Sequence, residues 1–292
     1  MLLKVQTIDQ CNQFFSAPTL HPLVSVCRPN CTAGHSLIQL SFYSVWLLEA
    51  CAHCPVCGRR PYDFGDATLL FLSPGRVLNC AAWCDSGNCR MLAFHPALLA
   101  GTPLGAHISD YTFFRYRTDE ALHVSAREKA VIQTCLDHVG QELSWGVDAF
   151  SHRLLVGRIE LLLNYGARFY HRQFISRHEV QPPLAERAEA LLTHYFLCGQ
   201  VRLKGLPDVD FCARSLQMSA AYFDDMLKYE TGYRLPQYLQ TLRLRLACRL
   251  LRTSARSVAD IAALLGYPSE PCFTRLFRLA QGCDPQAYRA AN

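Results

Sequence analysis

A chain of 292 residues with 50% apolar and 18% charged side chains is long enough for two folded domains and too apolar to be intrinsically disordered. No apolar run approaches the ~20 residues of a membrane-spanning helix. Residues 1–10 lack the apolar core of a secretion signal, so we expect a cytoplasmic protein. The net charge is +5, and most of the basic excess follows residue 183, where 14 Lys and Arg stand against 10 Asp and Glu. This asymmetry favours an anionic partner for the C-terminal part.

The first 120 residues alternate short apolar runs with turn-forming residues such as Ser73-Pro74-Gly75. Short strands that follow one another without intervening helices predict a β-barrel or a β-sandwich. The expected strands cover residues 36–40, 43–48, 68–72, 76–78 and 91–94.

After residue 120 the apolar period becomes helical. Ser125 and Glu128 form a capping-box pattern at the start of a helix over residues 125–143. The next helix, over residues 147–176, carries a broad apolar stripe. This stripe predicts either a face that pairs two subunits or a face that packs on the strands of the same chain.

Pro182 and Pro183 interrupt the helical pattern and mark a domain boundary. We expect an amphipathic helix over residues 184–196 and a loop over residues 199–205.

The segment from Ala213 to Tyr288 contains two copies of one pattern. The first two pairs of matching residues are offset by 49 positions and the other six by 50, so one extra residue lies between Leu265 and Ser269. A length change confined to a turn predicts two helix-turn-helix pairs. The matching residues are Ala213 and Ala262, Leu216 and Leu265, Ser219 and Ser269, Phe223 and Phe273, Leu227 and Phe277, Lys228 and Arg278, Gly232 and Gly282, and Tyr238 and Tyr288.

A helix-turn-helix pair places its second helix, the recognition helix, in the major groove of double-stranded DNA. The recognition helices are expected over residues 220–229 and 271–280, each after a supporting helix, at residues 209–216 and 258–265. A single helix over residues 236–252 links the two pairs. Two recognition helices on one rigid linker predict contact with adjacent major grooves, ~34 Å apart.

The outward positions of these helices supply the candidate DNA contacts. Arg275 can bind guanine with two hydrogen bonds, and Thr274 can contact a base or a phosphate. On the linking helix, arginines at steps of three and four form a stripe, from residue 245 to residue 256, that fits either phosphate binding or a solvated salt-bridging face. Arg243 lies off the stripe and fits a salt bridge within the domain. The candidate DNA-binding residues are Ser219, Ala220, Asp224, Asp225, Lys228, Arg245, Arg249, Ser269, Thr274, Arg275 and Arg278.

A further set of residues extends from the linking helix to the C-terminus: Arg243, Ala247, Leu250-Leu251, Asp260-Ile261-Ala262, Leu265-Gly266-Tyr267, Phe273, Arg275, Phe277-Arg278, Gly282, Pro285 and Tyr288-Arg289. In this set the chain resembles the DNA-binding domain of the AraC/XylS family of bacterial transcription regulators. The resemblance covers the C-terminal third of the chain. It implies a bipartite site on promoter DNA and activation through contact with RNA polymerase.

The chain departs from the family pattern at Pro268, Pro271 and Cys272, and its first recognition helix carries two carboxylates, Asp224 and Asp225. A carboxylate repels phosphates but accepts a hydrogen bond from cytosine N4. We therefore expect the second helix pair to contribute more affinity and the first more discrimination. The alternative is that the first pair docks to the polymerase or another partner.

Segments of the N-terminal half, among them residues 62–64, 72–75 and 168–174, are similar to the cupin-like sensor and dimerisation domain of the same family. This likeness implies an α+β chain that forms a homodimer and binds a small-molecule or oxidant effector. It implies a cupin-like barrel or sandwich over residues 1–120 and a helical dimerisation region and linker over residues 121–182. An all-α domain with two helix-turn-helix pairs follows over residues 183–292.

The chain has 15 cysteines, and six of them lie in two expected loops. These six thiols can hold zinc or another soft metal, or oxidise to disulfides, which predicts a redox or metal sensor. The alternative is a set of scattered reduced thiols, since no pair of CxxC motifs is present in the sequence. We expect that the chain requires no cofactor. The six are Cys51, Cys54, Cys57, Cys80, Cys84 and Cys89.

Enzyme motifs are absent from the sequence. The 11 histidines are dispersed, and neither a Gly-rich phosphate loop nor a G-x-S-x-G elbow occurs. We therefore expect a sequence-specific transcription activator rather than an enzyme. Two alternatives stay open: a regulator that transfers an alkyl group from DNA to a cysteine, and a constitutive DNA-binding protein without an effector.

Overall fold

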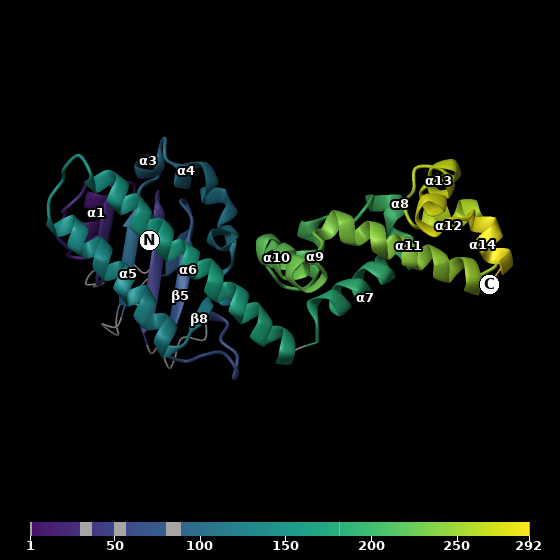
Figure 1. Ribbon diagram of the computed structural model, residues 1–292, viewed down its shortest axis with the longest axis horizontal. Helices are drawn as coiled ribbons and strands as arrows, with labels where there is room; N and C mark the ends of the chain where they lie inside the picture. Colours follow the sequence, from purple (N-terminus) through teal and green to yellow (C-terminus); the bar gives the residue numbers. More distant parts are fainter. Residues whose placement is uncertain (1, 30–36, 50–56, 80–88, 181, 292) are drawn as a thin grey trace. The chain divides into compact units, whose positions relative to one another are not determined.

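The computed structural model describes residues 2–29, 37–49, 57–79, 89–180 and 182–291. The chain divides into two compact units, Met1–Glu179 and Val180–Asn292, which we call the N-terminal and C-terminal units (Figure 1). The strands and the two long helices that follow them belong to the N-terminal unit, and the C-terminal unit is entirely helical. Within the described residues, none of the helices is both long enough and apolar enough to cross a membrane.

The N-terminal unit contains two β-sheets. The larger is antiparallel, and the smaller pairs its first two strands in parallel. Over the described residues the sheets do not close into one barrel, so the arrangement corresponds to the sandwich form of the expected fold. The larger sheet has the order β2 (Val24–Cys27), β7 (Cys89–Phe94), β4 (Tyr43–Glu49), β5 (Ala67–Leu72) and β8 (Leu122–Val124); the smaller has the order β1 (Leu2–Val5), β3 (Leu37–Leu40) and β6 (Val77–Asn79).

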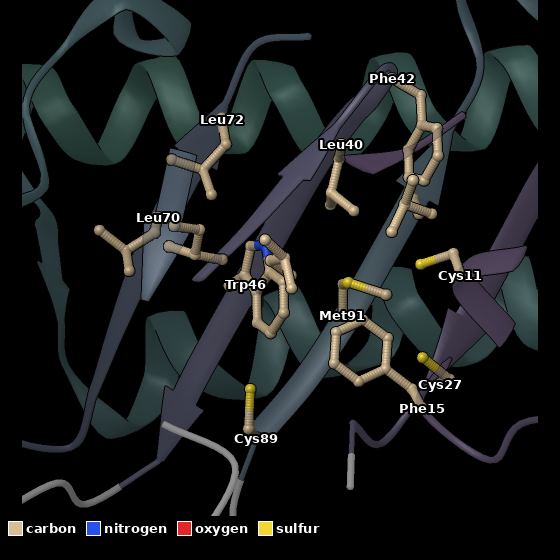
Figure 2. Packing of buried hydrophobic residues seen from close by; sticks show 14 of the residues in the cluster. Cys11, Phe15, Cys27, Leu40, Phe42, Trp46, Leu70, Leu72, Cys89 and Met91 are labelled. Carbon is tan, nitrogen blue, oxygen red and sulfur yellow. The ribbon is translucent and has the colours of Figure 1, made fainter. Parts of the chain in front are cut away.

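The central strands of the larger sheet are buried on both faces, which explains their nearly continuous apolar sequence. Alternate residues such as Trp46, Leu70 and Met91 point toward the core that the larger sheet shares with α1 (Ile8–Phe14) and the smaller sheet. Figure 2 shows these side chains on the sheet face opposite the long helices. The other face meets α6 (Ser151–Val180), where a Cβ at Gly166 would lie 2.8 Å from the ring of Phe71.

The expected strands all form, with bounds shifted by one or two residues. Strands β1, β2 and β8 and helix α1 were not predicted. The missed strands have only three or four residues, which gives a weak periodic signal, although β3 and β6 are as short and were predicted. The segment between β7 and β8 contains two short helices, α3 (Pro96–Leu99) and α4 (Pro103–His107), followed by three single-turn 3-10 helices.

Helix α5 (Ala126–Ser144) begins with the expected capping box, in which the Ser125 hydroxyl accepts from the Glu128 N–H. The apolar stripe of α6 is largely buried inside the N-terminal unit, including Ile159, Leu162 and Phe169. Packing on the strands of the same chain therefore accounts for most of this stripe. The predicted stripe consists of Leu154, Leu155, Ile159, Leu162, Leu163, Tyr165 and Phe169, and Leu154 is its one exposed residue, at 46%.

The C-terminal unit consists of eight helices over its described residues. Their bounds agree closely with the expected helices, with two exceptions: residues 199–205, expected as a loop, contain the short helix α8, and the last helix, Pro285–Ala291, was not predicted. The helices are α7 (Leu184–Leu197), α8 (Gln200–Lys204), α9 (Val209–Ser215), α10 (Ala220–Thr231), α11 (Leu235–Thr253), α12 (Val258–Leu264), α13 (Glu270–Gln281) and α14 (Pro285–Ala291).

Candidate nucleic-acid interface

The two helix pairs, α9–α10 and α12–α13, begin and end in the same way. The Ser219 hydroxyl accepts from the Tyr222 N–H at the start of α10, and the Ser269 hydroxyl accepts from the Cys272 N–H at the start of α13. Each helix ends at a glycine whose N–H bonds to the carbonyl four residues earlier. The repeat in the sequence is therefore a repeat of helix starts and stops.

The extra residue of the second pair is Pro268. The N–H of Met218 bonds to the Ala213 carbonyl in the first turn, and the N–H of Tyr267 bonds to the Ala262 carbonyl in the second, so the offset is still 49 there. The capping serines that follow are offset by 50. The insertion thus lies between a hydrogen bond and a cap that both turns share, and it leaves the helices on either side unchanged.

Gly266 holds the second turn in a conformation that a side chain would disturb. Its φ is +72°, and a Cβ would lie 2.5 Å from Cγ1 of Val201. Val201 is on α8, so this close approach also fastens α8 to the second helix pair. In the first turn the equivalent residue, Gln217, has a φ of +60°.

Helix α13 presents most of its surface to solvent. Only Phe273 and Phe277 are buried, and Phe273 packs on the Tyr267 ring at a centroid distance of 4.9 Å. The opposite face forms a shallow depression. Its lining residues are Glu270, Pro271, Thr274, Arg275, Arg278 and Leu279.

The two arginines of this depression differ in their contacts. Arg278 donates from Nε to Asp284 at 2.9 Å, and both side chains are largely exposed. Arg275 is exposed and, over the part of the chain that the structure describes, has no ion-pair partner. Its five N–H donors are therefore free to bind an external acceptor.

Helix α10 is more deeply packed than α13, with four buried residues instead of two. The carboxylate of Asp224 forms an ion pair with Arg234 and accepts from the Leu235 N–H at 3.5 Å. Asp224 thereby satisfies the start of α11, whose N-cap residue makes no side-chain cap hydrogen bond. Its side chain is only 16% exposed, and its carboxylate holds the start of α11 in place. Asp225 is half-buried and Lys228 is exposed.

The arginines of α11 are of two kinds. Arg243 is buried, donates from Nε to the Leu265 carbonyl at 2.7 Å and lies 3.8 Å from the centre of the Tyr267 ring. It therefore binds a carbonyl and an aromatic ring in the second helix pair, where a salt bridge was expected. Burial lowers the pKa of Arg243, but the guanidinium stays charged. Arg245 is paired with Glu189 on α7 at 2.8 Å, and Arg249 is exposed.

Two helices that precede the repeat support it. At the N-terminus of α7, the N–H groups of Leu184 and Ala185 donate to the Glu230 carboxylate on α10, at 3.0 and 2.7 Å. A carboxylate at a helix N-terminus is favourable because of the helix dipole. Through α7 and α8 the residues before the repeat thus contact both helix pairs.

Four of the six candidate sensor cysteines, Cys51, Cys54, Cys80 and Cys84, lie outside the described residues. Cys57 and Cys89 are each 2% exposed and belong to the apolar core of the N-terminal unit; Figure 2 shows Cys89 beside Trp46. Over the described ranges, no group of three His, Cys, Asp or Glu side chains is arranged to hold a metal.

The structure adds Glu270, Pro271 and Leu279 to the candidate residues of the α13 surface. Leu279 lies one helical turn after Arg275, and Glu270 is the first residue after the capping serine. Helical spacing from Arg275 would have indicated Leu279 in the sequence, but an apolar residue is not an obvious DNA contact.

The C-terminal unit is similar in sequence to known proteins. A family model described as a helix-turn-helix domain matches residues 212–291. The regulatory protein SoxS of Salmonella typhimurium is 37% identical over 82 residues, 28% of this chain and 77% of SoxS. The transcriptional activator RhaR of Mannheimia succiniciproducens is 38% identical over 81 residues, 28% of this chain. The solved C-terminal domain of AraT from Geobacillus stearothermophilus is 25% identical and covers 38% of this chain and 87% of that domain, with a TM-score of 0.31.

The match covers different shares of these relatives. The chain spans 29% of the length of RhaR, whereas it spans 77% of SoxS. Both proteins are named as regulators. From this identity across most of SoxS, together with the two capped helix pairs, we conclude that the chain belongs to the AraC/XylS family of transcription regulators.

Proposed function

We propose that the chain binds double-stranded promoter DNA in a sequence-specific manner and activates transcription, with α13 as its main recognition helix. The observation that carries this proposal is the solvent face of α13. Arg275 has no partner in the described part of the chain, and Thr274 and Arg278 line the same depression. An exposed arginine on a capped recognition helix can donate two hydrogen bonds to guanine O6 and N7.

The contacts of α10 support unequal roles for the two helix pairs. Asp224 is engaged with Arg234 and the start of α11, so it leaves less charge to repel a phosphate. We assign reading of the first half-site to the N-terminal end of α10, around Ala220, with Asp225 and Lys228. Ser219 and Ser269 act through their caps, and Arg245 and Arg249 bind phosphates along α11. Arg245 must exchange Glu189 for a phosphate to do so.

For the N-terminal unit we propose the role of receiving a signal and pairing two copies of the chain. Its separate core and its two sheets support a domain that folds independently of the DNA-binding unit. Contact with RNA polymerase, a small-molecule effector and sensing by the six cysteines remain predictions. Serine at Cys51, Cys54, Cys80 and Cys84 tests the last: if hypochlorite, peroxide or zinc changes neither DNA binding nor transcription by the wild-type chain, or changes them equally in the serine variants, sensing by these cysteines is excluded.

The proposed DNA contact is tested by selecting duplexes from a random pool with the full chain and measuring affinity for the enriched duplex at fixed salt. Arg275→Ala should weaken binding about ten- to a hundredfold. Arg187→Ala removes the same charge from an exposed position on α7 and serves as the control, with a change of about twofold at most. Equal effects of the two substitutions, or no enriched duplex, would contradict the proposal.

A further inference from the structure

Leucine is exposed at one position of the proposed DNA-reading face. Leu279 lies on α13 with 77% of its surface in solvent, although neighbouring turns of the helix bury Phe273 and Phe277. It lines the same depression as Arg275, four residues earlier. An exposed side chain of this size gains free energy only when a partner removes it from water.

The charges around Leu279 indicate the kind of partner. Within one turn of Leu279 the charged residues of α13 are Arg275 and Arg278, and both bind anionic polymers. The one carboxylate that lines the depression, Glu270, lies at the other end of the helix, and Arg278 has to exchange its ion pair with Asp284 for a DNA contact. An apolar protein surface seated on Leu279 would have to desolvate both guanidinium groups. A DNA major groove instead offers acceptors to the arginines and one apolar group, the C5 methyl of thymine.

The spacing along the helix fits such a groove. Four residues of α-helix rise by about 6 Å, and neighbouring base pairs are separated by about 3.4 Å. A side chain one turn beyond Arg275 therefore reaches a base one or two pairs away from the guanine that Arg275 binds.

We propose that Leu279 is a specificity-determining residue that contacts the methyl group of a thymine, one or two base pairs from the guanine bound by Arg275. This inference rests on the proposed function and names part of the sequence that α13 reads. Contact with one buried methyl group corresponds to about a three- to fivefold gain in affinity.

The test replaces each thymine of the enriched duplex by deoxyuridine, which removes only the methyl group. For the wild-type chain we expect one replacement near the guanine contact to weaken binding about three- to fivefold. Leu279→Ala should bind the unmodified duplex as weakly as the wild type binds that uracil duplex, and should not distinguish the two. Leu276→Ala is the matched control, because Leu276 is on the same helix at 42% exposure but does not line the depression; it should keep the wild-type response.

The outcomes separate the two proposals. If the chain binds the enriched duplex and Arg275→Ala weakens it, but no thymine replacement changes affinity, the role of Leu279 is wrong and the proposed function stands. A Leu279→Ala variant that responds to uracil like the wild type also overturns the role of Leu279. If no duplex is enriched, both proposals fail. Because Leu279 is exposed, the substitution should leave the fold intact, which circular dichroism checks.

Discussion

Arginine serves two purposes within a few residues of α11. Arg243 and Arg249 lie on one helix, yet the first is buried against Tyr267 and the second is exposed. The spacing of the arginines correctly placed Arg243 off the basic stripe. It did not indicate which group accepts the hydrogen bond of Arg243. That acceptor is the backbone carbonyl of Leu265, 22 residues away, and a carbonyl looks the same at every position of a sequence.

Loss of the Arg243 contact should therefore affect stability, while loss of Arg249 should affect DNA binding. Arg243→Met removes a charge-assisted hydrogen bond and a cation–π contact, so the free energy of unfolding of the C-terminal unit should fall by about 2 kcal/mol. Arg249→Met should change it by less than about 0.5 kcal/mol. Urea denaturation followed by circular dichroism measures both, and equal losses would contradict the distinction.

The same pair of variants differs in the salt dependence of DNA binding. Each phosphate contact that is removed lowers the slope of log affinity against log salt by about 1. We expect that reduction for Arg249→Met and an unchanged slope for Arg243→Met, once both are measured on folded protein.

At the scale of the element, the repeat made the two helix pairs and the helix that links them predictable, because the signals for starting and ending a helix are local. Ser219 and Ser269 cap as the sequence indicated. The short helix α8 was missed because a glycine lies at each of its ends, a pattern that also describes a loop. What no local signal shows is that Val201 of α8 packs on Gly266, since that contact spans 65 positions.

Gly266→Ala should destabilise the C-terminal unit by more than about 1 kcal/mol, because the φ of +72° and the contact with Val201 both oppose a methyl group. Gly157→Ala is the matched control: Gly157 is helical and exposed, and a Cβ there meets nothing within 4 Å. That change should stabilise the N-terminal unit by about 0.5–1 kcal/mol. Thermal unfolding of the two variants gives the comparison, and a stable Gly266→Ala protein would show that the turn tolerates a side chain.

At the scale of the whole molecule, the N-terminal unit depends on polar contacts that the sequence could not reveal. Arg177, near the end of α6, pairs with buried Asp63 at 2.8 Å across 114 positions. His123 is fully buried, 3.9 Å from the same carboxylate, and its Nδ1 lies 3.0 Å from the Thr68 hydroxyl. Helical periodicity predicted α6, but only the folded unit brings the three ionisable groups, Arg177, Asp63 and His123, together.

These groups should make the stability of the N-terminal unit depend on pH. Burial lowers the pKa of His123 to about 4, and Arg177 and Arg59 add to the effect against the opposing charge of Asp63. Burial alone would raise the pKa of Asp63, but the hydrogen bond and charge of Arg177 outweigh it and hold the pKa below its usual value.

The direction of the pH effect on stability follows from the protons that the folded and unfolded chains bind. The unfolded chain takes up a proton on His123 near pH 6.5 whereas the folded chain resists it, so stability is full above pH 6.5 and falls as the pH drops toward 4. The contribution of Asp63 is lost at still lower pH. Thermal unfolding between pH 7.5 and about 4.5 measures the fall; in His123→Gln it should be shallower, with a remainder from His21, whose pKa burial also lowers. A flat wild-type profile would contradict the assignment.

The central claim is that the two recognition helices lie in adjacent major grooves, with Arg275 at a guanine. Methylation interference on the selected duplex tests it most directly, because dimethyl sulfate modifies guanine N7 in the major groove and adenine N3 in the minor groove. We predict two clusters of guanine interference separated by about one helical turn of 10–10.5 base pairs, with Arg275→Ala losing interference at a guanine in one cluster only. Interference confined to adenine N3, or an Arg275→Ala pattern identical to that of the wild type, would contradict the account.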